Sequence, residues 1–268
     1  MIQNLMNQYL MTRSRISSKT SAPSAFSALL QRLEALGFKK RSSFGSLIWQ
    51  GQYQGRETIL TISRQSRTRY QGQSRRRQHL GWRLRIEIGC QVLTRLFFVK
   101  ESATRWRLMR WLYRLKKQSV IEDLPKVLEG FDVVARDAAW GRDLLKDQAA
   151  MLRVASLLTE RSSARLRGSV YFQPERLHYG SGLLQPSDID APWVESLLQR
   201  AGQIADSAER LPGPQIQDKT TRLERLSREQ PLIGGCLILA ALLGGLIILT
   251  IIGLGLVLAL SWGLSSLQ

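Results

Sequence analysis

The chain has 268 residues, of which 39 are Lys or Arg and 21 are Asp or Glu, so its formal net charge is +18. The hydrophobic fraction of 44% excludes a wholly disordered polypeptide, because such chains lack the apolar residues needed for a core. Only two cysteines are present, Cys90 and Cys236, and the second lies in an apolar C-terminal run. These two residues exclude a disulfide framework as the basis of the fold.

The basic charge is concentrated in the first half of the chain. Residues 1–120 hold 24 Lys and Arg against 4 Asp and Glu, whereas residues 121–230 are nearly neutral. Residues 231–268 hold no charged side chain. A positive field of this kind attracts anionic lipid headgroups or nucleic acid.

In chain order, residues 1–22 are predicted to be a flexible basic arm and residues 23–210 an α+β domain, with a subdomain break near residue 120 as an alternative. Antiparallel hairpins packed with several helices are expected, because the pattern lacks regular βαβ alternation. Strands are predicted over 44–54, 57–64, 80–88, 92–100, 131–136, 167–172 and 176–179. Helices are predicted over 23–36, 104–117, 139–160 and 190–210.

Between the second and third predicted strands, the sequence is strongly basic. It reads as a long hairpin tip around Gly72 and carries Arg64, Arg67, Arg69, Arg75, Arg76 and Arg77. Three interpretations are open: a solvated loop without a partner, contact with anionic lipid headgroups, or contact with the phosphates of RNA or DNA. Tyr70 is the only aromatic residue in the tip, so base stacking has little support.

The predicted helix 104–117 has an apolar face and a basic face. Leu108, Trp111, Leu112 and Leu115 share the first, and Arg107, Arg110, Arg114 and Lys117 share the second. This pattern fits either a helix packed on the sheet or an interfacial helix with its cations on lipid phosphates. The basic residues of this helix and of the hairpin tip are the candidate anionic-surface contacts.

No catalytic, cofactor-binding or metal-ligating constellation is found in the sequence. His79 and His178 have no neighbouring His or Cys with metal-ligand spacing. Asp188 and Asp190 precede a helix, where N-capping accounts for them. We therefore expect no cofactor, and catalysis is not the favoured function.

After the predicted juxtamembrane linker 211–230, the apolar run 231–264 is long enough to cross a bilayer. A single tilted helix is favoured, and a helical hairpin is the alternative. Small residues at four-residue spacing would allow another helix to approach closely. The predicted packing positions are Ala240, Gly244, Gly255, Ala259 and Gly263.

Charges that flank the apolar run predict its orientation. Arg222, Arg225 and Arg228 lie before it, and no Lys or Arg follows it. The positive-inside rule then predicts a single-pass membrane protein with residues 1–230 in the cytoplasm.

The segment Trp49-Gln50-Gly51-Gln52-Tyr53-Gln54-Gly55-Arg56 and the strand after it resemble a hairpin of uncharacterised bacterial membrane-associated proteins. Gly130-Phe131-Asp132-Val133 and the hairpin 168–179 are also similar to that family, so the likeness spans 45–180. The resemblance implies a bacterial, membrane-associated α+β protein of unknown function, and it carries over no catalytic residue.

The sequence favours a tail-anchored membrane protein whose basic cytoplasmic domain is a binding or scaffolding module at the anionic membrane surface. The expected partners are the lipid bilayer, anionic lipids, and a protein or second copy that packs on the transmembrane helix. A membrane-tethered nucleic-acid-binding protein is the alternative. An enzyme is a third hypothesis, and a pocket that groups several of His79, His178, Asp132, Asp188 and Glu175 would support it.

Overall fold

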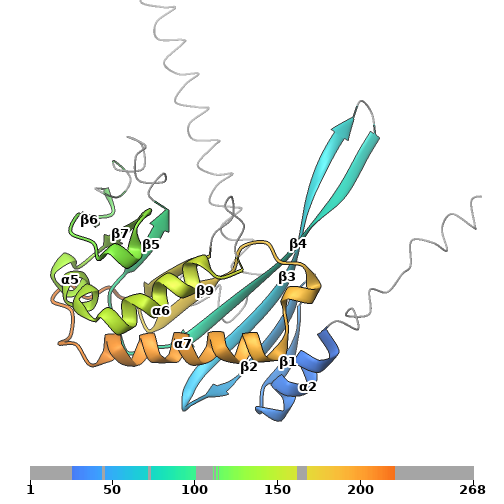
Figure 1. The fold of residues 1–268 in the computed structure, drawn as a ribbon, viewed down its shortest axis with the longest axis horizontal. Coiled ribbons are helices and arrows are strands. Elements are labelled where there is room, and N and C mark those ends of the chain that lie inside the picture. The colour runs from blue at the N-terminus through green and yellow to red at the C-terminus, as the bar shows by residue number, and fades with distance from the viewer. Residues whose placement is uncertain are drawn as a thin grey trace, which may run out of the picture. The chain divides into compact units, whose positions relative to one another are not determined.

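The computed structural model describes residues 26–43, 46–71, 74–100, 111, 113, 115–161 and 168–220. Among these residues, nine strands form one antiparallel sheet that packs with four α-helices (Figure 1). The strands are β1 Lys39–Ser43, β2 Ser46–Tyr53, β3 Arg56–Gln71, β4 Ser74–Gly89, β5 Leu96–Lys100, β6 Ser119–Ile121, β7 Phe131–Ala135, β8 Ser169–Gln173 and β9 Arg176–Gly180. The helices are α2 Ser27–Ala35, α5 Ala138–Lys146, α6 Gln148–Thr159 and α7 Ala191–Glu209. The predicted α+β class is confirmed.

Strand order in the sheet is β1-β2-β3-β4-β9-β8-β5-β7-β6. The first four strands follow one another as hairpins, and β9 then pairs with β4 through registers such as Ile86 with Tyr179. This pairing joins the N-terminal hairpins to the strands of the second half, so strands from both sides of residue 120 belong to one sheet.

Apolar residues at alternate positions of the central strands face the core. Leu60 and Ile62 of β3 pair with Ile86 and Leu84 of β4, and all four side chains are fully buried. Figure 1 shows α6 and α7 lying across the sheet. The apolar side of α7 closes this core with Val194, Leu197, Leu198, Ala201, Ile204, Ala205 and Ala208.

The predicted first helix is present as α2. Phe26, Leu29 and Leu33 are buried on one side of this helix, whereas Leu30 is half-buried. Phe26 meets Trp82 of β4 edge-on, with ring centroids 5.2 Å apart. This contact fixes α2 against the sheet.

The prediction of one long helix over 139–160 is wrong, because the chain forms α5 and α6 with a break at Asp147. The backbone of Asp147 leaves the helical region, with φ −74° and ψ 91°. Its carboxylate accepts a hydrogen bond from the Ala150 amide at 3.0 Å and so caps α6. Apolar periodicity continues through the break, which explains why the sequence pattern did not reveal it.

Two strands of the sheet were not predicted from the sequence. β1 reads Lys-Lys-Arg-Ser-Ser and has no apolar alternation, and β6 has only three residues within a stretch predicted to be a loop. Both lie at the edges of the sheet, where one backbone ladder is enough to hold them.

The last described helix begins as predicted. The Asp190 carboxylate accepts a hydrogen bond from the Trp193 amide at 2.8 Å, and Pro192 lies in the first turn of α7. Beyond α7, residues 211–218 reach the segment between β4 and β5, where the Asp218 amide donates to the Leu93 carbonyl at 2.6 Å. The described residues through Asp218 belong to one compact unit.

The predicted transmembrane segment 231–264 and its proposed packing residues lie outside the described residues. Within the part of the chain that the structure describes, no helix has the length and apolar character needed to cross a membrane.

Candidate functional site

The strongest candidate site is the outer part of the β3–β4 hairpin, which we call the arginine ribbon, residues 64–71 and 74–80. The neighbouring strand β2 pairs with β3 only as far as Ser63, and β9 pairs with β4 no farther out than Arg85. Trp82 of β4 still bridges to Leu184, and beyond it β3 and β4 pair only with each other among the described residues. Figure 1 shows them projecting from the sheet. Six residue pairs at 3.3 Å each give this projection a length of about 20 Å.

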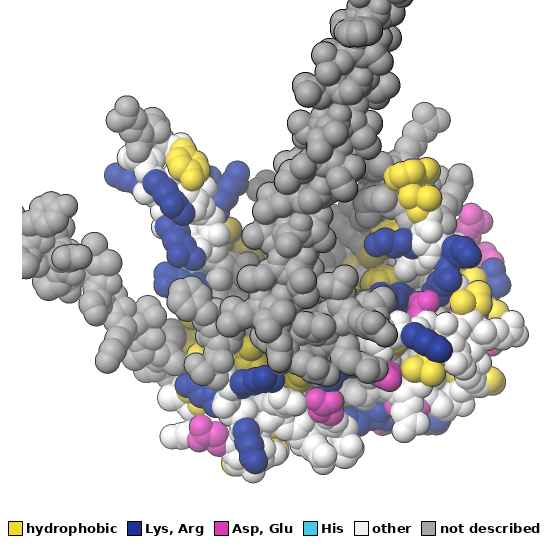
Figure 2. Space-filling model, turned by 180° about the vertical axis from the view of Figure 1, so that it is seen from behind, with side chains coloured by type: hydrophobic (Ala, Val, Ile, Leu, Met, Phe, Trp, Pro, Cys, Tyr) yellow, Lys and Arg dark blue, Asp and Glu magenta, His cyan; other side chains and the backbone are white. Residues whose placement is uncertain are grey.

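The predicted long hairpin tip is a paired ribbon over most of its length. Its ladder continues from Ser66 opposite His79 to Gln71 opposite Ser74. All six arginines of the predicted tip lie on it, and the side chains of residues 74–80 are exposed. On the side seen in Figure 2, the ribbon carries basic side chains in dark blue, which are its arginines, and no acidic side chain in magenta.

The charged side chains along the hairpin are all positive. From residue 58 to residue 86 the sequence contains eight arginines and no Asp, Glu or Lys. Within the described residues, none of the six ribbon arginines forms an ion pair. Arginine presents a planar set of donors that matches phosphate and carboxylate oxygens. The ribbon thus offers uncompensated donors for an anionic partner.

Register divides the six arginines equally between the two faces of the ribbon. Alternate residues of a strand point to opposite faces, and directly paired residues share a face. The first face, which we call the Tyr70 face, carries Tyr70, Arg64, Arg75 and Arg77. The opposite face carries Arg67, Arg69 and Arg76.

Two arginines of the Tyr70 face are oriented by side chains of the ribbon itself. Arg77 Nε donates to Ser66 Oγ at 2.8 Å, and Arg64 Nε donates to His79 Nδ1 at 3.1 Å. The Tyr70 ring is 73% exposed near the end of the ribbon. This face therefore combines three cations with one exposed aromatic ring.

A β-bulge lies where the ribbon leaves the sheet. Gln65 pairs with Gly81 and Ser66 with His79, so Leu80 has no partner of its own. Gly81 has φ +146°, and a Cβ placed on it would lie 2.9 Å from the Leu184 carbonyl oxygen. Trp82 and Leu184 exchange two backbone hydrogen bonds of 2.9 Å beside it. Only glycine fits this junction, and the sequence offered Gly81 alone as a signal of it.

The second group of predicted anionic contacts is only partly visible. Arg107, Arg110 and Arg114 lie outside the described residues, and Lys117 is exposed in a turn with φ +52°. Residues 111, 113 and 115 are helical. Trp111 is 54% exposed and Leu115 is 60% exposed, so these two members of the predicted apolar face do not enter the core.

The residues that would have supported an enzyme are dispersed. His178 is buried and lines a cavity of about 180 Å³ with Glu87 and Tyr171, but that cavity includes none of the other four residues. His79 is on the ribbon, Asp132 is on β7, and Glu175 is in the turn between β8 and β9. The Asp188 carboxylate accepts a hydrogen bond from the Gln185 amide within the 3-10 turn Pro186–Asp188, and Asp190 caps α7.

Cys90 does not offer a reactive thiol. Burial raises the pKa of the Cys90 thiol to about 12, so this thiol stays protonated at neutral pH. Among the residues that the structure describes, no three His, Cys, Asp or Glu side chains are grouped as metal ligands. The ribbon is the arrangement with the clearest binding chemistry.

No protein-family model matches this chain, and no curated protein or solved structure is significantly similar to it.

Proposed function

We propose that this chain is a membrane-anchored binding protein that uses the arginine ribbon to contact anionic headgroups on the cytoplasmic leaflet. One observation carries the proposal: six arginines without an acidic neighbour lie on a ribbon that projects from a well-packed sheet. The apolar run 231–264 supplies the expected anchor. A tethered domain needs little intrinsic affinity, because its ribbon is held at high local concentration near the leaflet.

The Tyr70 face is the side we assign to the membrane. A planar surface can meet only one face of a ribbon at a time, and Tyr rings are favoured at the level of lipid headgroups. Each basic residue near an anionic leaflet contributes about 1 kcal/mol, so the three arginines of this face supply about 3 kcal/mol. That is enough to orient a domain already attached by its C-terminus.

The presence of arginines on both faces favours one second candidate, a membrane-tethered protein that binds double-stranded nucleic acid. The major groove of B-DNA admits a two-stranded β-ribbon and has phosphates along both walls. A ribbon in that groove would use the Tyr70 face and the opposite face together. Affinity would then fall steeply with salt.

The two faces provide a matched pair of variants. One variant is Arg64→Gln/Arg75→Gln/Arg77→Gln, and the other is Arg67→Gln/Arg69→Gln/Arg76→Gln. Both remove three charges from the same ribbon. A third variant, Lys126→Gln/Arg142→Gln/Lys146→Gln, removes three exposed charges away from it.

The test uses the full chain in nanodiscs of neutral lipid or of neutral lipid mixed with phosphatidylserine. Energy transfer from a dye at Thr68→Cys to a headgroup-labelled lipid reports the approach of the ribbon. We expect transfer only with phosphatidylserine, a large loss in the Tyr70-face variant and little change in the other two. Equal transfer on neutral and anionic discs would refute contact with the leaflet.

Nucleic acid is tested with the same proteins in neutral discs, by fluorescence anisotropy of a labelled DNA or RNA duplex at low salt. The groove hypothesis predicts that the two ribbon variants weaken binding equally. It also predicts a salt slope that decreases by about 0.9 for each phosphate that an arginine no longer neutralises. Absence of binding at low salt would eliminate this second candidate.

A further inference from the structure

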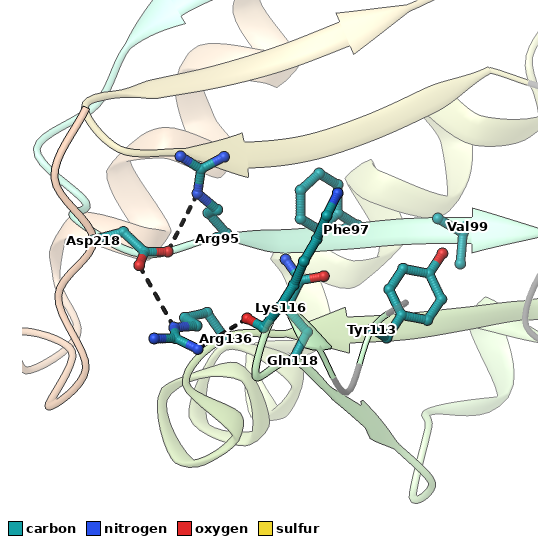
Figure 3. A pocket seen from close by; sticks show the side chains of 8 residues that line it. All are labelled: Arg95, Phe97, Val99, Tyr113, Lys116, Gln118, Arg136 and Asp218. Atoms are coloured by element: carbon teal, nitrogen blue, oxygen red, sulfur yellow. Dashed lines mark hydrogen bonds and ion pairs between the residues drawn. The ribbon is translucent and has the colours of Figure 1, made fainter. Parts of the chain in front are cut away.

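A second basic site lies away from the ribbon, beside strands β5 and β7. It is a cavity of about 440 Å³ that includes Arg95, Phe97, Tyr113, Lys116, Arg136 and Asp218 in its lining (Figure 3). Arg95 directly precedes β5, Phe97 lies in it, Arg136 directly follows β7, and Asp218 comes from the segment after α7. The residues that form it are up to 123 positions apart in the chain, so no local motif marks the site.

Asp218 is held between two arginines. Its Oδ2 lies 3.3 Å from Arg95 Nε, and its Oδ1 lies 3.5 Å from Arg136 Nε. Figure 3 shows the carboxylate between the two guanidinium groups, at one end of the cavity. Arg136 is also fixed from behind, because its Nη1 donates to the carbonyls of Lys116 and Lys117 at 2.9 and 3.0 Å. The two cations are thus positioned by the fold.

The match between Asp218 and these cations is incomplete. Arg136 Nε and Asp218 Oδ2 are buried, yet neither has a hydrogen-bond partner among the described residues. Buried polar groups are normally hydrogen-bonded, and a missing partner is costly. Among the described residues of the lining, Lys116 adds a third cation to Arg95 and Arg136, and Asp218 is the one carboxylate. The described side chains therefore leave one buried donor, Arg136 Nε, without a hydrogen bond.

The geometry points to a binding site for a phosphate monoester, in which the Asp218 carboxylate is an internal competitor for the ligand phosphate. The phosphate oxygens would accept hydrogen bonds from Arg95 and Arg136, and Lys116 would add its charge. The rings of Phe97 and Tyr113 line the rest of the cavity and would contact the carbon-bearing part of the ligand. A phosphate has more acceptor oxygens and more negative charge than one carboxylate, so it suits three cations better.

A bound phosphate would displace the Asp218 side chain but not the backbone of the segment that carries it. Asp218 is anchored through its amide to the Leu93 carbonyl, and the Ile216 amide donates to Asp137 Oδ2 at 3.0 Å. The backbone is therefore held independently of the Asp218 carboxylate. Displacing that carboxylate leaves the backbone hydrogen bonds of Ile216 and Asp218 in place.

The experiment uses the full chain in neutral detergent and measures inorganic phosphate binding by equilibrium dialysis. Arg136→Gln and Arg95→Gln are each expected to weaken binding about tenfold, because each removes a charge-assisted hydrogen bond. Asp218→Asn is expected to strengthen binding, because it removes the competing negative charge. Lys116→Gln, at an exposed position, should weaken binding less than either arginine variant.

Two controls separate this site from the ribbon and identify the source of the phosphate. Arg142→Gln on α5 removes an exposed charge elsewhere, and the Tyr70-face variant removes three charges from the ribbon; neither should alter phosphate binding. A parallel arm measures the full chain in nanodiscs that contain phosphatidic acid. Binding of inorganic phosphate indicates a soluble ligand. If Arg95→Gln and Lys116→Gln weaken only the binding to phosphatidic acid, the ligand is a lipid headgroup.

The proposal is overturned if neither phosphate source binds to wild type or to Asp218→Asn. It is also overturned if binding is unchanged in Arg95→Gln, Arg136→Gln and Lys116→Gln. A loss of leaflet binding by the ribbon variants has no bearing on these outcomes, so the two sites succeed or fail separately.

Discussion

Arg69 and Arg76 lie directly opposite each other in the β3–β4 ladder, on the same face of the ribbon. Like charges at directly paired positions destabilise a two-stranded ribbon. Two strands without a third neighbour are only marginally stable in water. The ribbon therefore carries a charge arrangement that weakens it when it is free and that a bound anion would relieve.

Replacing one of these arginines should improve the stability of the ribbon and weaken only the binding that uses the face opposite Tyr70. Arg76→Glu places a carboxylate opposite Arg69, which should stabilise the pair by about 0.2–1 kcal/mol. We expect slower amide hydrogen exchange along residues 66–79 and weaker binding of a nucleic-acid duplex that uses both faces, whereas leaflet contact through the Tyr70 face should change little. Gln78→Glu is the control, because it faces Arg67 and adds a similar pair without removing an arginine. Faster exchange in Arg76→Glu would contradict the role of repulsion.

The junction of the ribbon with the sheet should not tolerate a side chain at position 81. Gly81→Ala places a Cβ 2.9 Å from the Leu184 carbonyl oxygen and requires φ near +146°. We expect a loss of about 1–3 kcal/mol in the free energy of unfolding, measured by urea titration in neutral detergent. Gly213→Ala is the matched control, because a Cβ there has no atom within 4 Å, and it should change stability little.

A partly buried ion pair joins β3 to the end of α7. Arg56 Nη1 donates to Glu209 Oε1 at 2.7 Å, and the side chains are 18% and 21% exposed. Glu209→Gln should lower the free energy of unfolding by about 1.5–3 kcal/mol, because it weakens a charge-assisted pair. Glu195→Gln breaks the more exposed pair with Arg32 and should have a smaller effect. Equal losses of unfolding free energy in the two variants would show that burial does not decide the strength of these ion pairs.

The same pair makes stability depend on pH. The hydrogen bond from Arg56 holds the pKa of Glu209 below its usual range. A carboxylate with a lowered folded-state pKa stabilises the protein above its unfolded pKa of about 4.3, and this contribution is lost as pH falls further. We expect the free energy of unfolding of wild type to fall more steeply below about pH 4.3 than that of Glu209→Gln. Parallel curves would contradict this assignment.

The break between α5 and α6 should depend on its capping residue. The backbone amide of Ala150 donates to the Asp147 carboxylate and keeps the pKa of that group low. Asp147→Ala should lower the free energy of unfolding by about 1 kcal/mol, the usual cost of losing an N-cap. Asp143→Ala removes a carboxylate of α5 that pairs with the exposed Lys146, so a change within about 0.5 kcal/mol is expected. Thermal unfolding in neutral detergent provides the comparison.

Much of the local structure follows from short-range patterns in the sequence. The predicted strand 80–88 lies within β4, the predicted strands 44–54 and 57–64 correspond to β2 and β3, and the predicted helix 190–210 corresponds to α7 with its cap Asp190. In each case the information lies within a few residues, because strand alternation and helix caps are local effects. The arginine content of the ribbon was likewise evident, since it needs only a count of charges.

Other features depend on interactions between distant segments. β1 and β6 become strands only because the sheet offers them a free edge, and the helix break at Asp147 interrupts an apolar pattern that continues on both sides. The division of the arginines between two faces follows from the β3–β4 register, which is set across the hairpin.

By itself, the sequence determined the α+β class, the basic character of the first half and the charge-free apolar run, because composition and periodicity express these directly. The tertiary structure alone decided that the basic segment is a paired ribbon, and that Asp218 lies between Arg95 and Arg136. Such features need hydrogen bonds and ion pairs between residues far apart in the chain, and no local pattern encodes which distant partners will meet.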